Sequence, residues 1–284
     1  MLGYASYRYQ GGLLNEIPYS ESGKSALDVA IATVKTAGVM VRARFYSLKQ
    51  VSTKDDSSLV TDVDLQSEQI IRDALTVEFP NIGVLGEEMG LTGSGGKRWI
   101  VDPIDGTRNF AAGVPHFAIS IALVDGDKVL LGITYDPMRD ELFHAVTNQG
   151  AFLNGKPIKT SLRTSVSQAI LGFDLGGVDD RSLYAIRMIE HLWPNMQSIK
   201  VLGSATLSLA YTAAGRLDVY FHHRLSSWDV AAGLVLVTEA GGQVADRRTR
   251  QPANLASTGV VASSPALLEE FLELTRGLLW YSAS

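Results

Sequence analysis

The feature that most constrains the fold is a run of strand and turn signals in the middle of the chain. From Phe117 to Leu123 every second residue is large and apolar, a period of two that predicts a half-buried β-strand. The turn-forming pairs Asp125-Gly126, Asp136-Pro137 and Asn154-Gly155 follow, as expected for consecutive antiparallel strands. Such a sheet needs helices to cover it, so the chain is expected to fold into layers.

Helical patterns occur on both sides of this central region. Before it, Ser25 opens a helix with Asp28 placed close to a capping box, and a second helix runs from about Asp64 to Phe79. After it, strands alternate with helices expected over residues 182–192, 204–214, 230–240 and 265–279. We therefore predict a layered α/β or α+β sandwich.

The chain is expected to divide into an arm and two halves. Residues 1–24 lack a clear pattern and form the N-terminal arm, and residues 47–58 form a polar loop. Residues 25–160 make an N-terminal α+β half, and residues 161–284 make a C-terminal α/β half. This division agrees with a length of 284 residues, which is enough for about two domains.

Composition excludes several classes of function. The chain has no cysteine, which rules out disulfides, iron–sulfur clusters, thiolate zinc sites and a cysteine nucleophile. Its 25 basic and 30 acidic residues give a net charge of −5, which argues against a nucleic-acid partner. The longest apolar runs, such as 117–124, fall well short of the roughly 18 residues of a membrane helix. We expect a cytoplasmic protein that binds neither nucleic acid nor membrane.

Acidic side chains mark the points where predicted strands end or helices begin. Glu87 and Asp102 each follow an apolar strand, and Asp105 lies three residues beyond Asp102. Asp229 stands at the start of a later helix, where an N-cap role is the simpler alternative. A carboxylate at the end of a buried strand is costly unless it is paired or binds a cation. Because ligands bind at strand ends of open sheets, these acids predict a site for a hard cation such as Mg²⁺ or Mn²⁺.

The residues after Asp105 favour phosphate chemistry. Gly106 permits close backbone approach, and a helical turn from Thr107 to Phe110 presents amides that attract an anion. Two hard cations about 4 Å apart are suited to in-line displacement at phosphorus. Turn or solvated roles for the single acids stay open at this level.

Four segments resemble the motifs of the inositol monophosphatase family. They are LVTDVDLQSEQII (59–71), LGEE (85–88), WIVDPIDGTRNF (99–110) and WDVAAGLVLVTEAGG (228–242), and they occur in the family's order. The resemblance extends over roughly residues 25–275. It implies a five-layered αβαβα sandwich of the inositol monophosphatase and fructose bisphosphatase type, and a homodimer.

The resemblance also implies a set of metal ligands. Glu87, Asp102 and the backbone carbonyl of Ile104 would hold one ion, and Asp102, Asp105 and Asp229 a second. A third ion would be held loosely near Glu87 through waters. The cofactor implied is two or three Mg²⁺ ions, with Mn²⁺ as a substitute.

The remaining implied roles concern the phosphate and the attacking water. The amides of Gly106 and Thr107 would bind the phosphate, and Thr107, paired with Asp64, would help to activate the water. Lys54 matches the lysine of the family's mobile loop. The implied catalytic residues are Asp64, Glu87, Asp105 and Thr107. The implied reaction is Mg²⁺-dependent hydrolysis of a small sugar or inositol phosphate by metal-activated water, with in-line displacement.

The sequence departs from the family where the substrate would bind. Inositol-specific members carry a glutamate a few residues before the Trp-Asp pair, and here the corresponding stretch, His222-His223-Arg224, contains no acid. This basic cluster favours a substrate with a second anionic group, such as fructose bisphosphate or a nucleotide or phosphoadenosine phosphate. The alternative is that these are exposed residues at a strand end, where the adjacent histidines face opposite ways. Ser204 and Ala205 match a family segment that lines the substrate pocket.

Three other classes of protein fit less well. The haloacid-dehalogenase-like phosphatases need one residue between their two aspartates, whereas two separate Asp102 from Asp105. A nucleotide-binding P-loop is excluded because Gly93–Gly96 precedes a strand and no G-K-[ST] sequence occurs. A non-catalytic metal- or phosphate-binding protein on the same fold predicts loss of a metal carboxylate or of Thr107, and all are present.

Overall fold

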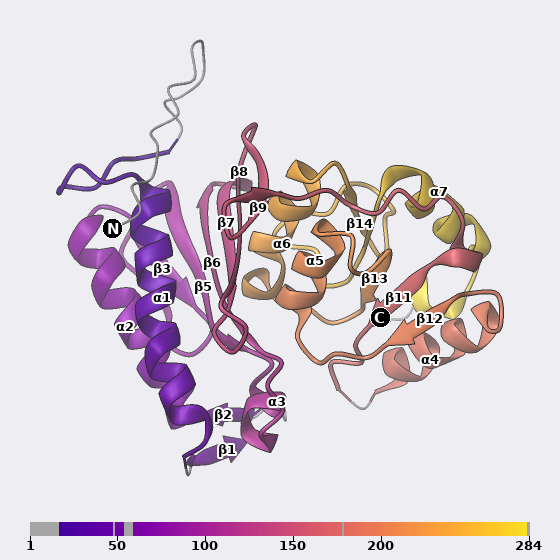
Figure 1. Cartoon of the computed structure of the whole chain (residues 1–284), viewed down its shortest axis with the longest axis horizontal. Coiled ribbons are helices and arrows are strands. Elements are labelled where there is room, and N and C mark those ends of the chain that lie inside the picture. Colours follow the sequence, from indigo (N-terminus) through magenta and orange to yellow (C-terminus); the bar gives the residue numbers. More distant parts are fainter. Residues whose placement is uncertain (1–16, 48, 54–58, 178, 283–284) are drawn as a thin grey trace.

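A computed structural model of the chain describes residues 17–47, 49–53, 59–177 and 179–282. These residues form five layers in the order αβαβα (Figure 1). The three helical layers pair α1 (Ala26–Phe45) with α2 (Asp62–Glu78), α5 (Ala205–Ala213) with α6 (Ser227–Glu239), and α4 (Asp180–Leu192) with α7 (Pro265–Leu274). Most of the predicted arm, residues 1–16, lies outside the described residues.

The larger sheet contains the predicted run of antiparallel strands. Its strand order is β10-β9-β8-β7-β6-β5-β3-β4, and only the pairing of β3 with β5 is parallel among these described strands. The strands are β3 (Gly83–Gly86), β4 (Gly90–Thr92), β5 (Lys97–Asp105), β6 (Ala118–Asp125), β7 (Lys128–Asp136), β8 (Glu141–Val146), β9 (Gly150–Leu153) and β10 (Lys156–Pro157).

The smaller sheet is mixed and belongs to the second part of the chain. Its order is β12-β11-β13-β15-β14, with β11 parallel to both β12 and β13. Its strands are β11 (Ile170–Phe173), β12 (Ser198–Lys200), β13 (Val219–His222), β14 (Gln243–Asp246) and β15 (Val260–Ser263). Helices α5 and α6 therefore lie between two sheets, and their largely apolar surfaces are buried against both.

Two local expectations were wrong. The polar loop of residues 47–58 contains strand β1 (Val51–Thr53), which pairs antiparallel with β2 (Leu59–Thr61). Asp102 does not follow its strand but belongs to it, since β5 continues through Pro103 to Asp105 with a shift of register against β6 between Asp102 and Asp105. Backbone pairing with a neighbouring strand outweighed the local signals in both places.

Short elements complete the described chain. They are α3 (Thr107–Ala112) and the 3₁₀ turns η1 (Val166–Gln168) and η2 (Leu279–Tyr281). The last helix therefore ends earlier than the sequence pattern indicates. Among the helices of the described ranges, none has the length and apolar character that a membrane crossing requires.

Candidate active site

Three carboxylates meet where the larger sheet faces the middle helical layer. Asp102 and Asp105 come from β5 and Asp229 from the first turn of α6, and one oxygen of each lies within 4.8 Å of the others. Residues three apart in a regular strand point to opposite faces. The register shift between Asp102 and Asp105 removes that alternation, which lets both side chains join one cluster.

Asp102 is the most deeply buried member of the cluster, with 1% of its surface exposed. Its Oδ1 accepts a hydrogen bond from the Ile104 amide at 3.1 Å, and its buried Oδ2 has no hydrogen-bond partner. Burial, and then the negative charges of Glu87 and Asp105, raise the pKa of Asp102 well above its usual value. A buried carboxylate oxygen without a donor, beside further carboxylates, fits a hard divalent cation as its partner.

The N-terminus of α5 holds Asp105 in place. The Asp105 carboxylate accepts hydrogen bonds from the Ser204 hydroxyl, from the Thr206 amide at 2.8 Å and from the Thr206 hydroxyl at 2.7 Å. Ser204, predicted to contact substrate, is the N-cap of α5 and is 1% exposed, and Ala205 is 6% exposed. A contact of either residue with substrate stays a prediction.

Asp229 has a different helix position from the one expected for an N-cap. It is the third residue of α6 and closes a capping box with the N-cap Ser226. Its Oδ2 accepts a hydrogen bond from the Ser226 amide at 2.6 Å. The helix start therefore fixes the direction of this carboxylate toward the cluster. The cap and the metal role are compatible, because a carboxylate offers two oxygens.

Thr107 and Asp64 are paired, as the family resemblance implies. The Thr107 hydroxyl lies 3.0 Å from both Asp64 Oδ1 and the Ile104 carbonyl oxygen. Burial raises the pKa of Asp64 to about 6, although hydrogen bonds from Thr61 and Thr107 oppose the rise. Gly106, the residue directly before Thr107, has a φ of +96°, and a Cβ there would lie 3.1 Å from the Gly203 carbonyl oxygen. Only glycine fits this turn without strain.

Glu87 and Lys54 complete the predicted set. Glu87 follows β3, its amide donates to the Val101 carbonyl at 3.2 Å, and its charge contributes to the raised pKa of both Asp102 and Asp64. Glu87 is therefore electrostatically coupled to the carboxylate cluster. Lys54 lies outside the described residues.

The basic cluster at the end of β13 differs from its prediction. His222 and His223 are 4% and 0% exposed, and their rings stack at 5.4 Å with an interplanar angle of 17°. They do not face opposite ways, because β13 ends at His222 and strand alternation ends with it. Burial lowers the pKa of His222 to about 3 and that of His223 to about 4, so both are neutral near pH 7. Within this stretch Arg224 alone is exposed and positively charged.

Two side chains outside the predicted set hold the site together. Asn109 donates through Nδ2 to the carbonyl oxygens of His116 and Leu202, both at 2.8 Å, and so ties α3 to the loop before α5. Asp174 accepts hydrogen bonds from the Gly203 amide at 2.6 Å and the Leu202 amide at 3.0 Å. Asp174 directly follows β11, so the rule that singled out acids at strand ends also applies to it.

Asp174 provides a test of this electrostatic description. Burial raises its pKa to about 6 from an ordinary 3.8. The folded state then holds a proton that the unfolded state releases, so stability falls as the pH rises from about 4 to about 6. Asp174→Asn keeps both amide contacts on its oxygen and removes this dependence. We expect the variant-minus-wild-type difference in unfolding free energy to increase by about 3 kcal/mol between about pH 4 and about pH 7.

Denaturant unfolding in a chelator at several pH values measures this difference. Asp73→Asn, an exposed change on α2, serves as the control for the substitution itself. A flat difference for Asp174→Asn would contradict the assigned pKa.

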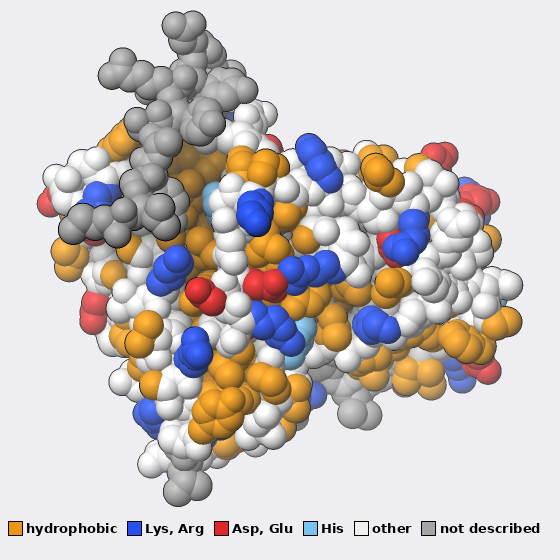
Figure 2. Space-filling view, viewed as in Figure 1, with side chains coloured by type: hydrophobic (Ala, Val, Ile, Leu, Met, Phe, Trp, Pro, Cys, Tyr) orange, Lys and Arg blue, Asp and Glu red, His pale blue; other side chains and the backbone are white. Residues whose placement is uncertain are grey.

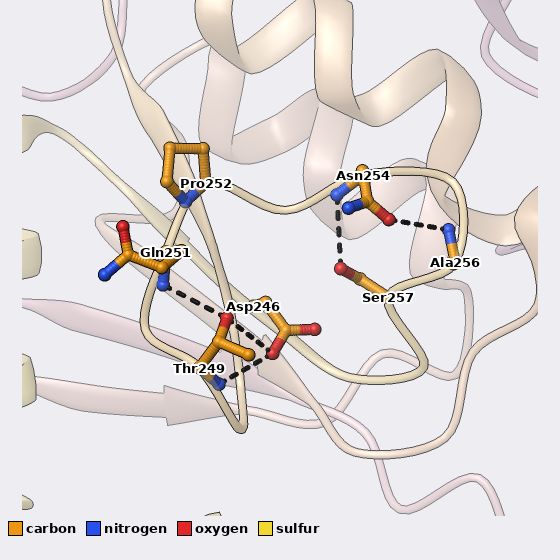
Figure 3. A pocket seen from close by; sticks show the side chains of 7 residues that line it. All are labelled: Asp246, Thr249, Gln251, Pro252, Asn254, Ala256 and Ser257. Atoms are coloured by element: carbon orange, nitrogen blue, oxygen red, sulfur yellow. Dashed lines mark hydrogen bonds between the residues drawn. The ribbon is translucent and has the colours of Figure 1, made fainter. Parts of the chain in front are cut away.

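A hollow in the described surface lies away from these residues. It has a volume of about 390 Å³ and is lined by Asp246, Thr249, Gln251, Pro252, Asn254, Ala256 and Ser257 (Figure 3). Its polar groups form hydrogen bonds with one another, for example where Asp246 accepts one from the Thr249 amide at 2.8 Å.

Basic and acidic side chains are intermixed on the face shown in Figure 2.

Comparison with known proteins agrees with this geometry. The sequence model of the inositol monophosphatase family matches residues 24–279 of this chain. The chain is 37% identical over 255 residues to inositol monophosphatase 1 of Solanum lycopersicum, covering 87% of this chain and 93% of the relative. It is 33% identical over 249 residues to the fructose-1,6-bisphosphatase/inositol-1-monophosphatase of Thermotoga maritima, covering 87% and 94%.

A solved structure confirms the predicted fold. The extragenic suppressor protein suhB of Bartonella henselae matches with a TM-score of 0.85 at 30% identity, covering 88% of this chain and 98% of that one. The five-layered sandwich expected from the resemblance is therefore confirmed.

Proposed function

Because the chain belongs to the inositol monophosphatase family of metal-dependent phosphomonoesterases, we propose that it hydrolyses a small sugar or inositol phosphate with Mg²⁺. The observation that carries this proposal is the cluster formed by Asp102, Asp105 and Asp229, whose oxygens lie within 4.8 Å of one another. Oxygen ligands of this kind suit Mg²⁺ or Mn²⁺.

We propose that these three carboxylates, Glu87 and the Ile104 carbonyl hold two or three divalent ions. Such ions, when bound, activate water and neutralise charge that develops on the phosphoryl group. The burial of Asp102 supports this role, because its partnerless oxygen gains a cation there. Asp105 and Asp229 are held toward the cluster by the starts of α5 and α6.

Thr107 and Asp64 act on the water and the phosphate in this proposal. Asp64 accepts a hydrogen bond from the Thr107 hydroxyl, which orients the lone pairs of that oxygen for a proton of the attacking water. The amides of Gly106 and Thr107 follow directly after Asp105 and would hold the phosphate oxygens. These steps use groups on α2, on α3 and at the N-cap of α3.

A screen of phosphate release tests the activity. The purified chain would be assayed with Mg²⁺ on inositol monophosphates, fructose bisphosphate, histidinol phosphate and phosphoadenosine phosphate, with a chelator as the blank. We expect Mg²⁺-dependent release from at least one substrate. Metal binding without release from any of them would favour the non-catalytic alternative.

Fructose bisphosphate is a second candidate substrate, because the stretch His222-His223-Arg224 lacks the glutamate of inositol-specific members and one relative carries both activities in its name. With both histidines neutral, Arg224 is the residue of this stretch that can attract a second phosphate. We expect Arg224→Gln to lower kcat/KM for fructose bisphosphate about tenfold. The change for a monophosphate should stay within about twofold. Equal effects on both substrates would remove this candidate.

Three further statements stay predictions of the sequence and the resemblance. They are the homodimer, the cytoplasmic location, and the division into an N-terminal half of residues 25–160 and a C-terminal half of residues 161–284. Light scattering after size exclusion tests the homodimer.

A further inference from the structure

Helix α2 turns a polar stripe toward the site. Asp64, Ser67 and Glu68 are 1%, 0% and 0% exposed and lie at helical spacing on one face. Buried polar side chains of this kind need hydrogen-bond partners. Asp64 bonds to Thr107, and the Ser67 hydroxyl donates to the Pro103 carbonyl at 3.0 Å, in the shifted segment between the two aspartates of β5. The stripe thus contacts two of the segments that carry the site.

Glu68 contacts a third such segment. Its Oε2 accepts a hydrogen bond from the Glu88 amide at 2.7 Å, and its Oε1 accepts one from the Met89 amide at 3.0 Å. These two amides directly follow Glu87. One buried carboxylate on α2 therefore fixes the backbone of the turn between β3 and β4, which presents the Glu87 side chain.

Arg72 supports this carboxylate from one helical turn away. Its Nε donates to Glu68 Oε1 at 2.7 Å, and its Nη1 donates to the Thr92 hydroxyl at 2.8 Å and the Val84 carbonyl at 3.2 Å. The guanidinium is itself nearly buried, at 6% exposure. It balances the charge of Glu68 and joins β3 and β4 on either side of the turn.

Gly86 leaves the space that this arrangement needs. A Cβ at Gly86 would lie 2.1 Å from Glu68 Oε1, which is inside any acceptable contact. The carboxylate thus packs directly on the last residue of β3. The turn cannot move toward α2 while Glu68 stays in place. This contact therefore restricts the position of Glu87 on the side that faces α2.

We propose that Glu68, backed by Arg72, is a positioning residue that fixes the turn after β3 and so aims the Glu87 carboxylate at the cation site. This inference rests on the proposed function, since it takes Glu87 as a metal ligand. Mutation of a residue that holds a metal ligand in place typically weakens metal binding by about 10- to 100-fold. Glu68 acts through backbone amides and does not touch the reacting atoms.

A second buried carboxylate that pairs with an arginine provides a control, although its partner Arg163 is 38% exposed. Asp218 is 1% exposed, accepts from Arg163 Nη1 at 2.9 Å and accepts from the Ile170 amide at 2.6 Å. It therefore has the same chemistry as Glu68: a buried carboxylate with an arginine and a backbone amide. Asp218 joins elements of the second sheet and holds no predicted metal ligand.

The test compares Glu68→Gln with Asp218→Asn in Mn²⁺ binding, followed by paramagnetic resonance of the free ion, and in thermal unfolding without metal. Both variants should unfold at lower temperature, because each removes a buried carboxylate that accepts hydrogen bonds from an arginine and from backbone amide groups. We expect Mn²⁺ binding to weaken about 10- to 100-fold in Glu68→Gln and less than about threefold in Asp218→Asn. Equal Mn²⁺ binding by wild type and Glu68→Gln would overturn the inference.

Two further measurements cover a variant that fails to fold. Glu68→Gln with Arg72→Gln removes both buried charges and should show the same loss of Mn²⁺ binding. In the metal-free wild type, the amides of Glu88 and Met89 should be protected from hydrogen exchange as α2 is, and rapid exchange of both would overturn the inference. If the wild type binds no Mn²⁺, the proposed function fails as well, whereas failure of the Glu68 comparison alone leaves that function standing.

Discussion

Replacing Asp102 with Asn is expected to reduce Mg²⁺-dependent phosphate release by about a thousandfold or more. Asp102 is the most deeply buried member of the carboxylate cluster, and the proposed function has it shared by two of the ions. Asparagine keeps the shape and an oxygen that accepts the Ile104 amide. It removes the charge and the second oxygen, which is the one without a protein donor. The loss should therefore fall on metal binding and turnover.

The same variant should stay folded, which separates a site effect from misfolding. In the metal-free protein the charge of Asp102 is unfavourable, because burial and its acidic neighbours raise its pKa. The folded protein thus binds this proton more tightly than the unfolded chain, and deprotonation above the ordinary carboxyl pKa lowers stability. A neutral amide avoids that penalty, so unfolding in a chelator near neutral pH should require at least as much denaturant as for wild type.

Asp125→Asn is the matched control for Asp102→Asn. Asp125 ends β6, and its exposed carboxylate pairs with Lys97 at 2.7 Å on the surface. Its replacement should change phosphate release by less than about twofold. Phosphate release from Asp102→Asn within about tenfold of wild type would refute its assignment as a metal ligand.

Replacing Thr107 with Val is expected to lower kcat about 10²- to 10⁴-fold with little change in Mn²⁺ binding. Valine keeps the branched shape of threonine and removes the hydroxyl that lies 3.0 Å from Asp64 and from the Ile104 carbonyl. No carboxylate is altered, so the ligands stay in place. Steady-state kinetics and a Mn²⁺ titration on the same preparation separate the two effects.

Thr212→Val serves as the control for the hydroxyl itself. Thr212 is buried in α5, where its hydroxyl donates to the Ser208 carbonyl at 2.9 Å. Its replacement should leave kcat nearly unchanged. A Thr107→Val enzyme with wild-type kcat would contradict the assigned part of Thr107 in activating water, while a parallel loss of Mn²⁺ binding would indicate that this hydroxyl supports the Ile104 carbonyl as a ligand.

Periodicity and motif spacing carried most of the prediction of the fold. The alternation from Phe117 to Leu123 and the turn pairs after it predicted the antiparallel strands, and both are present. Those signals reside in neighbouring residues, so they can be recognised without tertiary contacts. The signals failed at Asp102 and in residues 51–53, because the pairing partner that overrides a local preference lies elsewhere in the chain.

Charge states were the part of the site that the sequence did not predict correctly. His222-His223-Arg224 reads as a basic cluster, yet burial makes both histidines neutral. Burial is a property of the packed layers and not of the residue type. Composition alone therefore gave the wrong charge for the stretch that was expected to contact substrate. The hydrogen bond from the Ser204 hydroxyl to Asp105 is likewise a contact that the sequence did not predict.

Residue types and their local spacing were enough to predict which chemical groups are available: oxygen donors at strand ends, a glycine where the backbone must turn with positive φ, and a layered arrangement of helices and strands. Packing of the layers decides which of these groups meet. Asp229 comes from a helix far along the chain and joins Asp102 and Asp105 because α6 packs on the larger sheet. Packing also decides that Glu68 and Arg72 face inward and hold the turn that carries Glu87. The physical reason is that period and residue type are local, whereas burial, pairing and the pKa of a group arise from contacts between distant segments.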